Sequence, residues 1–410
     1  MKKYLILGLS AAIGLSSCKN DKQETTKLKD GKWHAEFSAK DGSIPFTFEV
    51  EKGNSDSLAV VTLINGAERV PLEGITYKGD SVFIPIKAYD TELRGQIKGD
   101  TITGLFSRLF SENDKGVEFK AVYGDIPRFS TEGTSADSLD GKWDIQFITE
   151  TETKNNVGIF SQKDGILTGS ILTNSGDFRY LEGVSDKNGF RLSAFAGLSP
   201  YLIQGKFIDK DNFEGEFITA RGSQRIKGTR NANARLADPY GLTQLKKGYK
   251  SIDLKLKDLK GNEVSLSDPK FKDKVVIISV LGSWCPNCLD EAEFLAPWYK
   301  ENKDRGVEIV GLAFERKDDP EYVQKVLSNL VNKYGITYDV LFGGKIADSE
   351  KVLAALDGGL KSYPTTIFID KKGVVRKIHT GFNGPATGLF YDEFKADFNK
   401  LVDELLAEKQ

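Results

Sequence analysis

Residues 275–288 read VVIISVLGSWCPNC, an apolar run that ends in a short turn followed by two cysteines three residues apart. An uninterrupted run of apolar residues is typical of a strand that is covered on both faces of its sheet. The cysteines are Cys285 and Cys288, and the chain of 410 residues has only one other, Cys18. Two cysteines at this spacing directly after a buried strand predict reversible dithiol–disulfide chemistry.

The cysteine pair is expected to begin a helix that continues from Cys285 to Asn302. Backbone N–H groups in the first turn of a helix lack partners, and the helix dipole is positive there. A thiolate at that position is stabilised, so its pKa lies below the value of about 8.5 for free cysteine. Because Cys288 lies on the same face one turn deeper, we expect Cys285 to be the nucleophile and Cys288 to resolve the mixed disulfide.

A purely structural Cys285–Cys288 disulfide is one alternative, since exported proteins use cysteines in this way. A loop closed over so few residues removes little entropy from the unfolded chain, however, so its structural value is small. Half of a zinc site is another alternative. It fails because a zinc site needs four ligands, and the chain has no second cysteine pair and only two histidines, His34 and His379. We therefore expect a redox-active disulfide, no metal site and no cofactor.

Three neighbours of the pair are candidates for contact with substrate or for proton transfer. Trp284 either packs beside the thiols and shapes a docking surface or caps the core. Pro286 suits the first helical turn, where no donor is needed, and we expect it to face the substrate together with Trp284. Glu291, three residues after Cys288, is either a proton acceptor or a solvated acid, and we favour the solvated acid.

Residues 1–17 have the pattern of a lipoprotein signal peptide, in which two lysines precede an apolar stretch too short to span a bilayer. The sequence LSSC at 15–18 resembles a bacterial lipobox, in which the cysteine is lipidated and becomes the first residue of the mature protein. We therefore predict lipidation of Cys18 and a flexible, polar tether over residues 18–30. An ordinary secretory signal with an unmodified Cys18 is the alternative.

Residues 31–230 contain two copies of one pattern, offset by about 110 residues. Short segments alternate polar and apolar residues, and glycine, asparagine and aspartate separate them, as is typical of antiparallel strands joined by hairpins. The sequence Gly31-Lys32-Trp33 recurs as Gly141-Lys142-Trp143. Three further matches keep this order: LEG at 72–74 and 181–183, GQI at 95–97 with GKF at 205–207, and GLF at 104–106 with GEF at 215–217.

These patterns predict several domains. Residues 31–125 and 141–230 are two related all-β domains, each a small barrel or sandwich, and residues 126–140 link them. Residues 251–410 read as strands alternating with helices, then a hairpin and a final helix, which predicts an α/β domain with a mixed central sheet covered by helices. One of the helices expected in this domain lies near Ala347–Leu356.

The motif WCPNC at 284–288, the sequence Tyr363-Pro364-Thr365-Thr366 before an apolar strand, and a trailing Gly-x-Val hairpin resemble the thioredoxin superfamily. Together with the lipobox, an earlier Asp-Leu-x-Gly-x-x-Val-x-Leu hairpin points to its membrane-anchored TlpA/ResA-like branch of thiol–disulfide oxidoreductases. The resemblance covers residues 251–410. It implies a thioredoxin-like fold, a cis peptide bond before Pro364 facing the cysteine pair, and a Tyr363 backbone that hydrogen-bonds to substrate.

Two positions depart from that family. Thioredoxin itself has a buried aspartate six residues before its first cysteine, and Ser279 occupies that position here. Another base or a water molecule is therefore expected to take the proton. Our candidate is Glu315, at the end of a predicted strand, and the alternative is that Glu315 is a loop acid. Many relatives have a proline five residues after the second cysteine, where this chain has Glu293, and Pro297 follows four residues later.

The combined interpretation is a lipid-anchored thiol–disulfide oxidoreductase of the bacterial cell envelope, facing the periplasm or attached to the outer membrane, that reduces disulfides of exported proteins. Its expected partners are protein or small-molecule disulfides, an upstream thiol donor and, through Cys18, the membrane. The net charge of −2 gives no indication of nucleic-acid binding.

Two other functions stay open. A cell-envelope binding protein would use the β-repeats to capture a glycan, lipid or protein, with the C-terminal domain as an accessory. A copper carrier would hold Cu(I) with the two thiolates and His379, although such carriers more often space their cysteines more widely. A peroxiredoxin is disfavoured because the chain lacks a separate Pro-x-x-x-Thr-x-x-Cys element.

Overall fold

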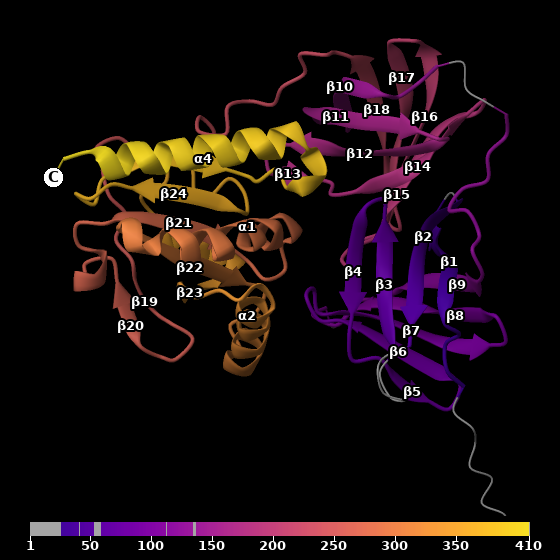
Figure 1. The fold of residues 1–410 in the computed structure, drawn as a ribbon, viewed down its shortest axis with the longest axis horizontal. Coiled ribbons are helices and arrows are strands. Elements are labelled where there is room, and N and C mark those ends of the chain that lie inside the picture. Colours follow the sequence, from indigo (N-terminus) through magenta and orange to yellow (C-terminus); the bar gives the residue numbers. More distant parts are fainter. Residues whose placement is uncertain (1–25, 41, 53–58, 112, 134–136, 410) are drawn as a thin grey trace, which may run out of the picture.

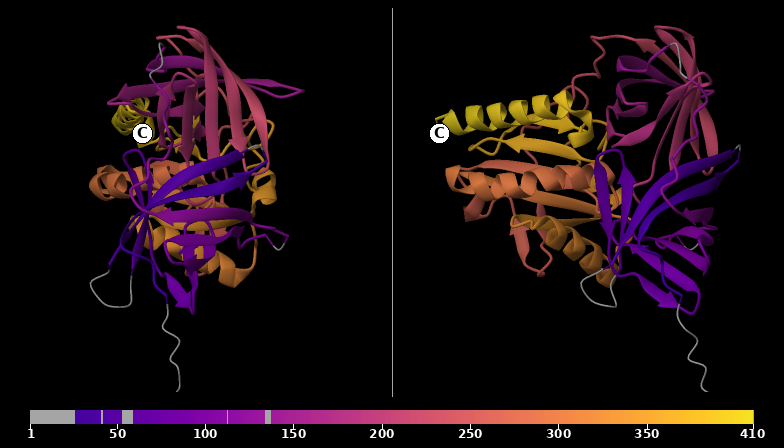
Figure 2. Two further views of the ribbon diagram at one scale, coloured as in Figure 1. Left: turned by 90° about the vertical axis from the view of Figure 1, so that its right-hand side faces the viewer. Right: turned by 45° about the vertical axis from the view of Figure 1, so that its right-hand side comes forward.

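The structure is a computed structural model, and it describes residues 26–409 except 41, 53–58, 112 and 134–136. Two β-sheet domains lie next to each other, and a C-terminal α/β domain lies beside both of them (Figures 1 and 2). This arrangement confirms the predicted fold class. The predicted signal peptide and Cys18 lie outside the described residues. Among the residues that are described, no helix is both long and apolar enough to cross a membrane.

The first β-domain is an open, curved sheet that forms a half-barrel, with antiparallel strands in the order β4-β3-β2-β1-β9-β8-β7-β6-β5. Alternate residues point to one side of the sheet, so that Trp33, Phe37 and Phe46 are fully buried in its core. In the described part of this domain the strands are β1 (Gly31–Ala39), β2 (Gly42–Glu51), β3 (Val60–Asn65), β4 (Glu68–Leu72), β5 (Thr76–Lys78), β6 (Ser81–Ile86), β7 (Thr91–Lys98), β8 (Thr101–Arg108) and β9 (Val117–Tyr123).

The second β-domain has a similar strand order but closes into a barrel, because β11 pairs with both β10 and β12. Its core is built around Trp143, Phe190 and Phe213. Its strands are β10 (Gly141–Ile148), β11 (Thr153–Lys163), β12 (Ile166–Thr173), β13 (Gly176–Asp177), β14 (Leu181–Asp186), β15 (Gly189–Ala194), β16 (Tyr201–Asp209), β17 (Asn212–Thr219) and β18 (Gly222–Arg230). The short β13 pairs only with the end of β12 and reaches toward the α/β domain (Figure 1).

The repeated sequence motifs occupy equivalent places in the two β-domains. The indole N–H of the repeated tryptophan donates to the carbonyl four residues earlier in both, at 3.0 Å for Trp33 and 2.7 Å for Trp143. Two repeated glycines face each other across neighbouring strands in both domains, Gly95 with Gly104 and Gly205 with Gly215. A Cβ atom on Gly104 would lie 2.0 Å from a backbone oxygen, so these strands approach too closely for a side chain.

The C-terminal domain has a mixed sheet in the order β23-β22-β21-β24-β25, whose first three strands are parallel and whose last two continue it in antiparallel pairing. The strands are β21 (Val275–Leu281), β22 (Val307–Glu315), β23 (Asp339–Lys345), β24 (Thr365–Ile369) and β25 (Val375–Thr380), and a separate hairpin is formed by β19 (Lys255–Lys257) and β20 (Glu263–Ser265). The helices are α1 (Pro286–Asn302), α2 (Pro320–Tyr334), α3 (Ser349–Val352) and α4 (Leu389–Ala407), with single 3-10 turns at η1 (Pro269–Phe271), η2 (Lys303–Arg305), η3 (Ile346–Asp348) and η4 (Pro385–Thr387).

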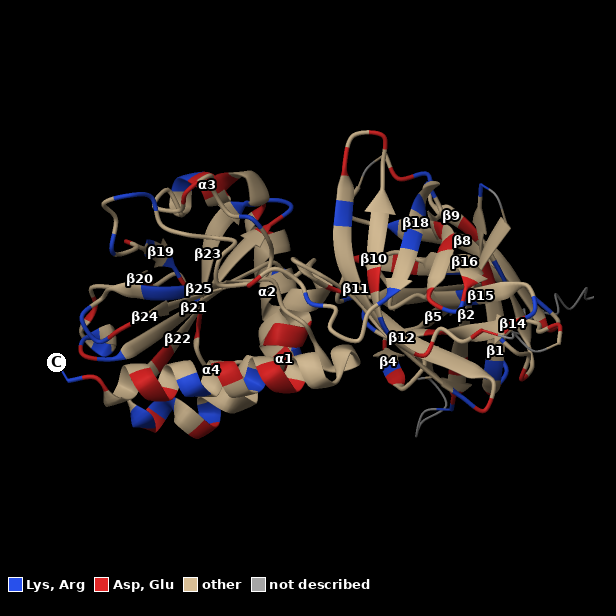
Figure 3. Cartoon of the chain, turned by 90° about the horizontal axis from the view of Figure 1, so that it is seen from above, with Lys and Arg blue, Asp and Glu red and all other residues tan. Residues whose placement is uncertain are grey.

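The apolar run of β21 is buried at every position, as expected for a strand covered on both faces. Ile277 packs with α1, α2 and α4, whereas its neighbour Ile278 packs on the other side with residues from the segment 252–271. α4 carries both acidic and basic residues along its length, which suits a helix with one face in solvent (Figure 3). The packing on both faces of the sheet thus holds β21 in place, and the cysteines follow directly after its C-terminal end.

Two details differ from the sequence-based expectation. The helix expected near Ala347–Leu356 is reduced to η3 and the four residues of α3. The strand β23, which contains two glycines, was not predicted from the sequence. Those glycines make room for a neighbour: a Cβ atom on Gly343 would lie 2.6 Å from the ring of Phe314, and the register of β22 with β23 shifts at this point.

Candidate active site

The cysteine pair lies where β21 ends and α1 begins. Cys285 caps the helix with an extended backbone (φ −101°, ψ 112°), and its Sγ accepts a hydrogen bond from the Cys288 N–H at 3.2 Å. The half-buried Pro286 is the first helical residue. The two cysteines form a disulfide with their Cα atoms 5.2 Å apart. A sulfur that accepts a backbone N–H at a helix N-terminus is placed where a thiolate is stabilised.

A second loop, which carries Pro364, adjoins the pair because of the sheet pairing. β24 begins directly after Pro364 and runs antiparallel to β21, with Thr365 opposite Val280. The start of β24 therefore lies at the edge where β21 ends and the cysteines follow. The peptide bond between Tyr363 and Pro364 is cis. The Pro364 carbonyl accepts the Gly381 N–H at 2.9 Å, which ties a third loop, after β25, to the same place.

Trp284 contacts both the core and the border of the site. Its indole N–H donates to the Phe314 carbonyl at 2.9 Å, and its ring meets the ring of Tyr363 edge-on at 5.1 Å between centroids. The guanidinium of Arg316 lies 5.6 Å from the Trp284 ring and 3.7 Å from the ring of Phe110, which belongs to the first β-domain. Aromatic and cation–π contacts thus link this side of the site to a second domain.

Glu291 is buried, so the favoured expectation of a solvated acid is wrong. Its side chain points from α1 into the sheet, where its carboxylate accepts hydrogen bonds from the hydroxyls of Ser279 on β21 and Thr366 on β24. Only 1% of the residue is exposed, and this burial raises the pKa of Glu291 to about 7. A carboxyl with such a pKa, three residues after Cys288 on the same helix, is suited to exchanging a proton near neutral pH.

Replacing this buried carboxyl by an amide should change how stability depends on pH. Between about pH 4.5 and 7 folded Glu291 holds a proton that the unfolded chain has released, so its contribution to the free energy of unfolding falls as the pH rises. We expect Glu291→Gln to gain roughly 1–3 kcal/mol relative to wild type between pH 5 and pH 8, measured by chemical denaturation. Glu321→Gln, at an exposed glutamate in the first turn of α2, is the matched control and should show no such trend. Parallel pH profiles for Glu291→Gln and wild type would contradict the prediction.

Glu315 is buried at the end of β22, so the alternative of a loop acid is wrong. Its carboxylate accepts the backbone N–H and the hydroxyl of Ser283, both at 2.8 Å, and burial raises its pKa. These bonds hold the turn that leads into Cys285. Its role as a proton acceptor stays a prediction, whereas its contacts make it a positioning residue for that turn.

His379 lies on β25 in aromatic surroundings. Its Nδ1 is 3.0 Å from the Gly381 carbonyl, its ring meets the rings of Tyr240 and Phe394, and burial lowers its pKa to about 4. Among the described residues, no group of three or more histidine, cysteine, aspartate or glutamate side chains is arranged to hold a metal ion.

Sequence reasoning missed a contribution from the second β-domain. The turn between β12 and β13 reaches the cysteine motif, where the Asn287 side-chain amide donates to the Asp177 carbonyl at 3.2 Å. The residue two further along, Arg179, forms ion pairs with Glu68 of the first β-domain and Asp290 of α1. Nothing in the local sequence marks these residues, because their partners lie 110 or 111 positions away.

Comparison with known proteins places the likeness in the C-terminal domain. The profile of the AhpC/TSA family matches residues 248–378. The thiol-disulfide oxidoreductase ResA of Geobacillus kaustophilus is 34% identical over 134 residues, which are 33% of this chain and 69% of that protein. The thiol:disulfide interchange protein DsbE of Vibrio cholerae is 31% identical over 144 residues, 35% of this chain and 70% of that protein. The crystal structure of a thioredoxin-family thiol:disulfide interchange protein from Chlorobium tepidum is 23% identical, with a TM-score of 0.31, and the match covers 40% of this chain and 99% of that one.

Proposed function

Since the C-terminal domain of this chain belongs to the thioredoxin-like thiol–disulfide oxidoreductases that include ResA and DsbE, we propose that the protein exchanges disulfides through Cys285 and Cys288. The observation that carries the proposal is the position of the pair. The Cys285 sulfur caps α1 and accepts a backbone N–H, and the loop with the cis peptide bond before Pro364 lies at the same edge of the sheet.

In the reductive direction the Cys285 thiolate attacks one sulfur of a substrate disulfide, and the other substrate sulfur leaves as a thiolate. The Cys288 sulfur then attacks Cys285 Sγ and releases the second substrate thiol. Two electrons pass to the substrate, and the Cys285–Cys288 disulfide remains. An upstream thiol donor returns the pair to the dithiol by the same steps in reverse.

Cys288 must lose its proton before it can attack. The group best suited to accept this proton is Glu291, which shares a helix face with Cys288 and has a pKa raised to about 7 by burial. It accepts a hydrogen bond from the hydroxyl of Ser279, the residue at the position where thioredoxin carries its aspartate. A carboxyl contributed by the helix thus takes the place of one contributed by the strand. Glu315, whose carboxylate accepts hydrogen bonds from Ser283 in the turn before the cysteines, is the second candidate.

The substrates we propose are disulfides of exported proteins, and the location is the bacterial cell envelope, with a lipid on Cys18 as the anchor. The support for both is the signal-like pattern of residues 1–17 with the lipobox, together with the likeness to ResA and DsbE. Substrate contacts are assigned to Trp284, Pro286 and the backbone of Tyr363. Cell fractionation with mass spectrometry of the Cys18 peptide tests the anchor, and an unmodified cysteine there would contradict it.

The direct test of the catalytic proposal is the reduction of insulin by the full-length protein with dithiothreitol as electron donor. Precipitation of the reduced insulin chains faster than with dithiothreitol alone supports the proposal. A rate equal to that of dithiothreitol alone, for protein whose cysteines have been shown to be reduced, would contradict it.

A further inference from the structure

The turn between β12 and β13 of the second β-domain lies across the redox face of the C-terminal domain. We call residues 173–177 the barrel hairpin. Three loops of the C-terminal domain meet at this face: the cysteine motif, the loop before Pro364 and the loop after β25. The barrel hairpin contacts all three, although more than 100 residues separate it from each of them.

Each of these loops donates a hydrogen bond to the barrel hairpin. The Asn287 amide donates to the Asp177 carbonyl at 3.2 Å, and the Ser362 hydroxyl donates to the Ser175 carbonyl at 3.4 Å. The Gly384 N–H donates to the Asp177 carboxylate at 2.6 Å. The acceptors are two backbone carbonyls and one carboxylate, presented by a short piece of chain without a bulky side chain in the contact.

The contact is also tight. A Cβ atom on Gly176 would lie 2.4 Å from Cγ of Asn287, and a Cβ atom on Gly381 would lie 2.6 Å from the Asn174 carbonyl oxygen. Glycine at these two positions lets the Gly176 backbone lie against the Asn287 side chain and the Gly381 backbone lie against that of Asn174. Cys285 and Cys288 expose only 4% and 2% of their surface, and the barrel hairpin is hydrogen-bonded to the loops that surround them.

We propose that the barrel hairpin occupies the position where substrate binds, and that it must move away before a disulfide-bearing chain can reach Cys285. The inference rests on the proposed function and adds the class of substrate. The three loops donate hydrogen bonds to two carbonyls and one carboxylate of the barrel hairpin. The same donors are suited to binding an extended polypeptide segment that has an acidic side chain and is recognised through its backbone.

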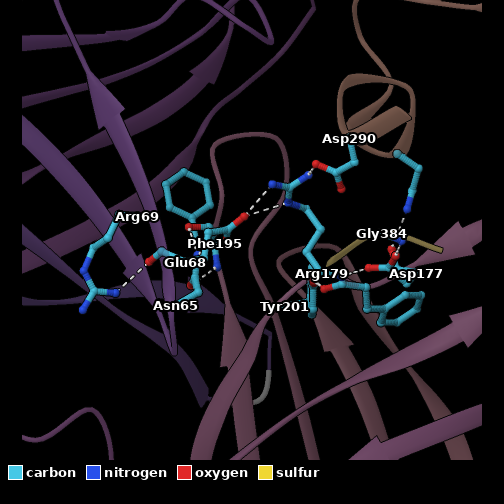
Figure 4. A network of polar contacts seen from close by, with 11 residues as sticks. Asn65, Glu68, Arg69, Asp177, Arg179, Phe195, Tyr201, Asp290 and Gly384 are labelled. Atoms are coloured by element: carbon cyan, nitrogen blue, oxygen red, sulfur yellow. Dashed lines mark hydrogen bonds and ion pairs between the residues drawn. The ribbon is translucent and has the colours of Figure 1, made fainter. Parts of the chain in front are cut away.

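The ion pairs of Arg179 hold the barrel hairpin in position. The Arg179 backbone N–H donates to the Asp177 carboxylate at 2.6 Å, and its guanidinium binds Glu68 of the first β-domain and Asp290 of α1 (Figure 4). The cover is therefore fastened beside the site by side chains from all three domains. Displacement of the hairpin requires a movement of the second β-domain relative to α1.

The test is a substitution that adds a large side chain to the barrel hairpin, where it contacts the C-terminal domain, and leaves the cysteines and the three loops unchanged. In Gly176→Leu the new side chain collides with Asn287, so the covered state is disfavoured. We expect alkylation of reduced Cys285 by a bulky maleimide, followed by peptide mass spectrometry, to be about tenfold faster or more than in wild type. Reduction of an extended, acidic disulfide peptide should accelerate in parallel, and by more than reduction of a compact folded disulfide protein.

Gly165→Leu is the matched control. Gly165, in the turn between β11 and β12, also has a positive φ, 81° against 147° for Gly176, but a Cβ atom there meets nothing within 4 Å. Its alkylation rate should equal that of wild type. Equal alkylation rates in wild type and Gly176→Leu, or equal acceleration in both variants, would contradict the proposal that the barrel hairpin covers Cys285. Faster alkylation in Gly176→Leu without disulfide reduction by any form would instead leave the cover standing and reject the proposed function.

Discussion

Replacing Cys285 with serine should abolish insulin reduction, with turnover falling about a thousandfold or more, because a hydroxyl at this position neither ionises near neutral pH nor forms a bond to sulfur. Cys288→Ser should also lose turnover, but for a different reason. Its Cys285 still attacks the substrate, and nothing then resolves the mixed disulfide. Only Cys288→Ser should therefore accumulate a covalent adduct, seen as a band on non-reducing gels that dithiothreitol removes.

Cys18→Ser is the control for this pair of variants, since it removes the one remaining cysteine of the chain. In detergent-free assays of purified protein it should turn over insulin like wild type. Turnover retained by Cys285→Ser would sink the nucleophile assignment. An adduct formed by Cys285→Ser and not by Cys288→Ser would reverse the roles of the two cysteines.

Local sequence was enough to predict the arrangement of strand, helix start and cysteine pair at the end of β21. The buried strand, the helix start and the spacing of Cys285 and Cys288 are properties of neighbouring residues, and the repeated glycines of the β-domains mark positions where strands touch. The family likeness then supplied Pro364. These features could be read because each depends on contacts within one element or on one short motif.

Burial that depends on how separate elements pack together could not be predicted in the same way. Glu291 looks like any acid near a helix start, and only the position of α1 against β21 and β24 brings it to Ser279 and Thr366. The barrel hairpin is harder still, since a Ser-Gly-Asp turn in a barrel is typical of a solvated loop. Its contact with Asn287 depends on how two separately folded sheets dock, which no period or motif in the sequence encodes.

Arg179→Ala is expected to destabilise the junction of the three domains by about 3–5 kcal/mol, because it leaves two buried carboxylates without their cation. Glu68 and Asp290 are both buried, and the Arg179 guanidinium reaches Glu68 Oε1 from Nε at 2.9 Å and from Nη2 at 2.6 Å while Nη1 binds Asp290 (Figure 4). Even with this cation present, burial raises the pKa of Asp290 to about 7. The measurement is the free energy of unfolding from chemical denaturation.

The pH dependence separates this cause from a general loss of packing. Without Arg179 the buried Asp290 holds its proton to a higher pH than in wild type, so folding of the variant takes up a proton that the unfolded chain has released. The loss in free energy of unfolding of Arg179→Ala relative to wild type should therefore be smallest near pH 5 and grow as the pH rises to 8. Arg235→Ala is the matched control, because Arg235 pairs with Glu393 on α4 at an exposed site where such pairs contribute about 0–1 kcal/mol. A deficit for Arg179→Ala that matches this control, or that shrinks as the pH rises, would show that Arg179 does not bind two buried carboxylates at the junction.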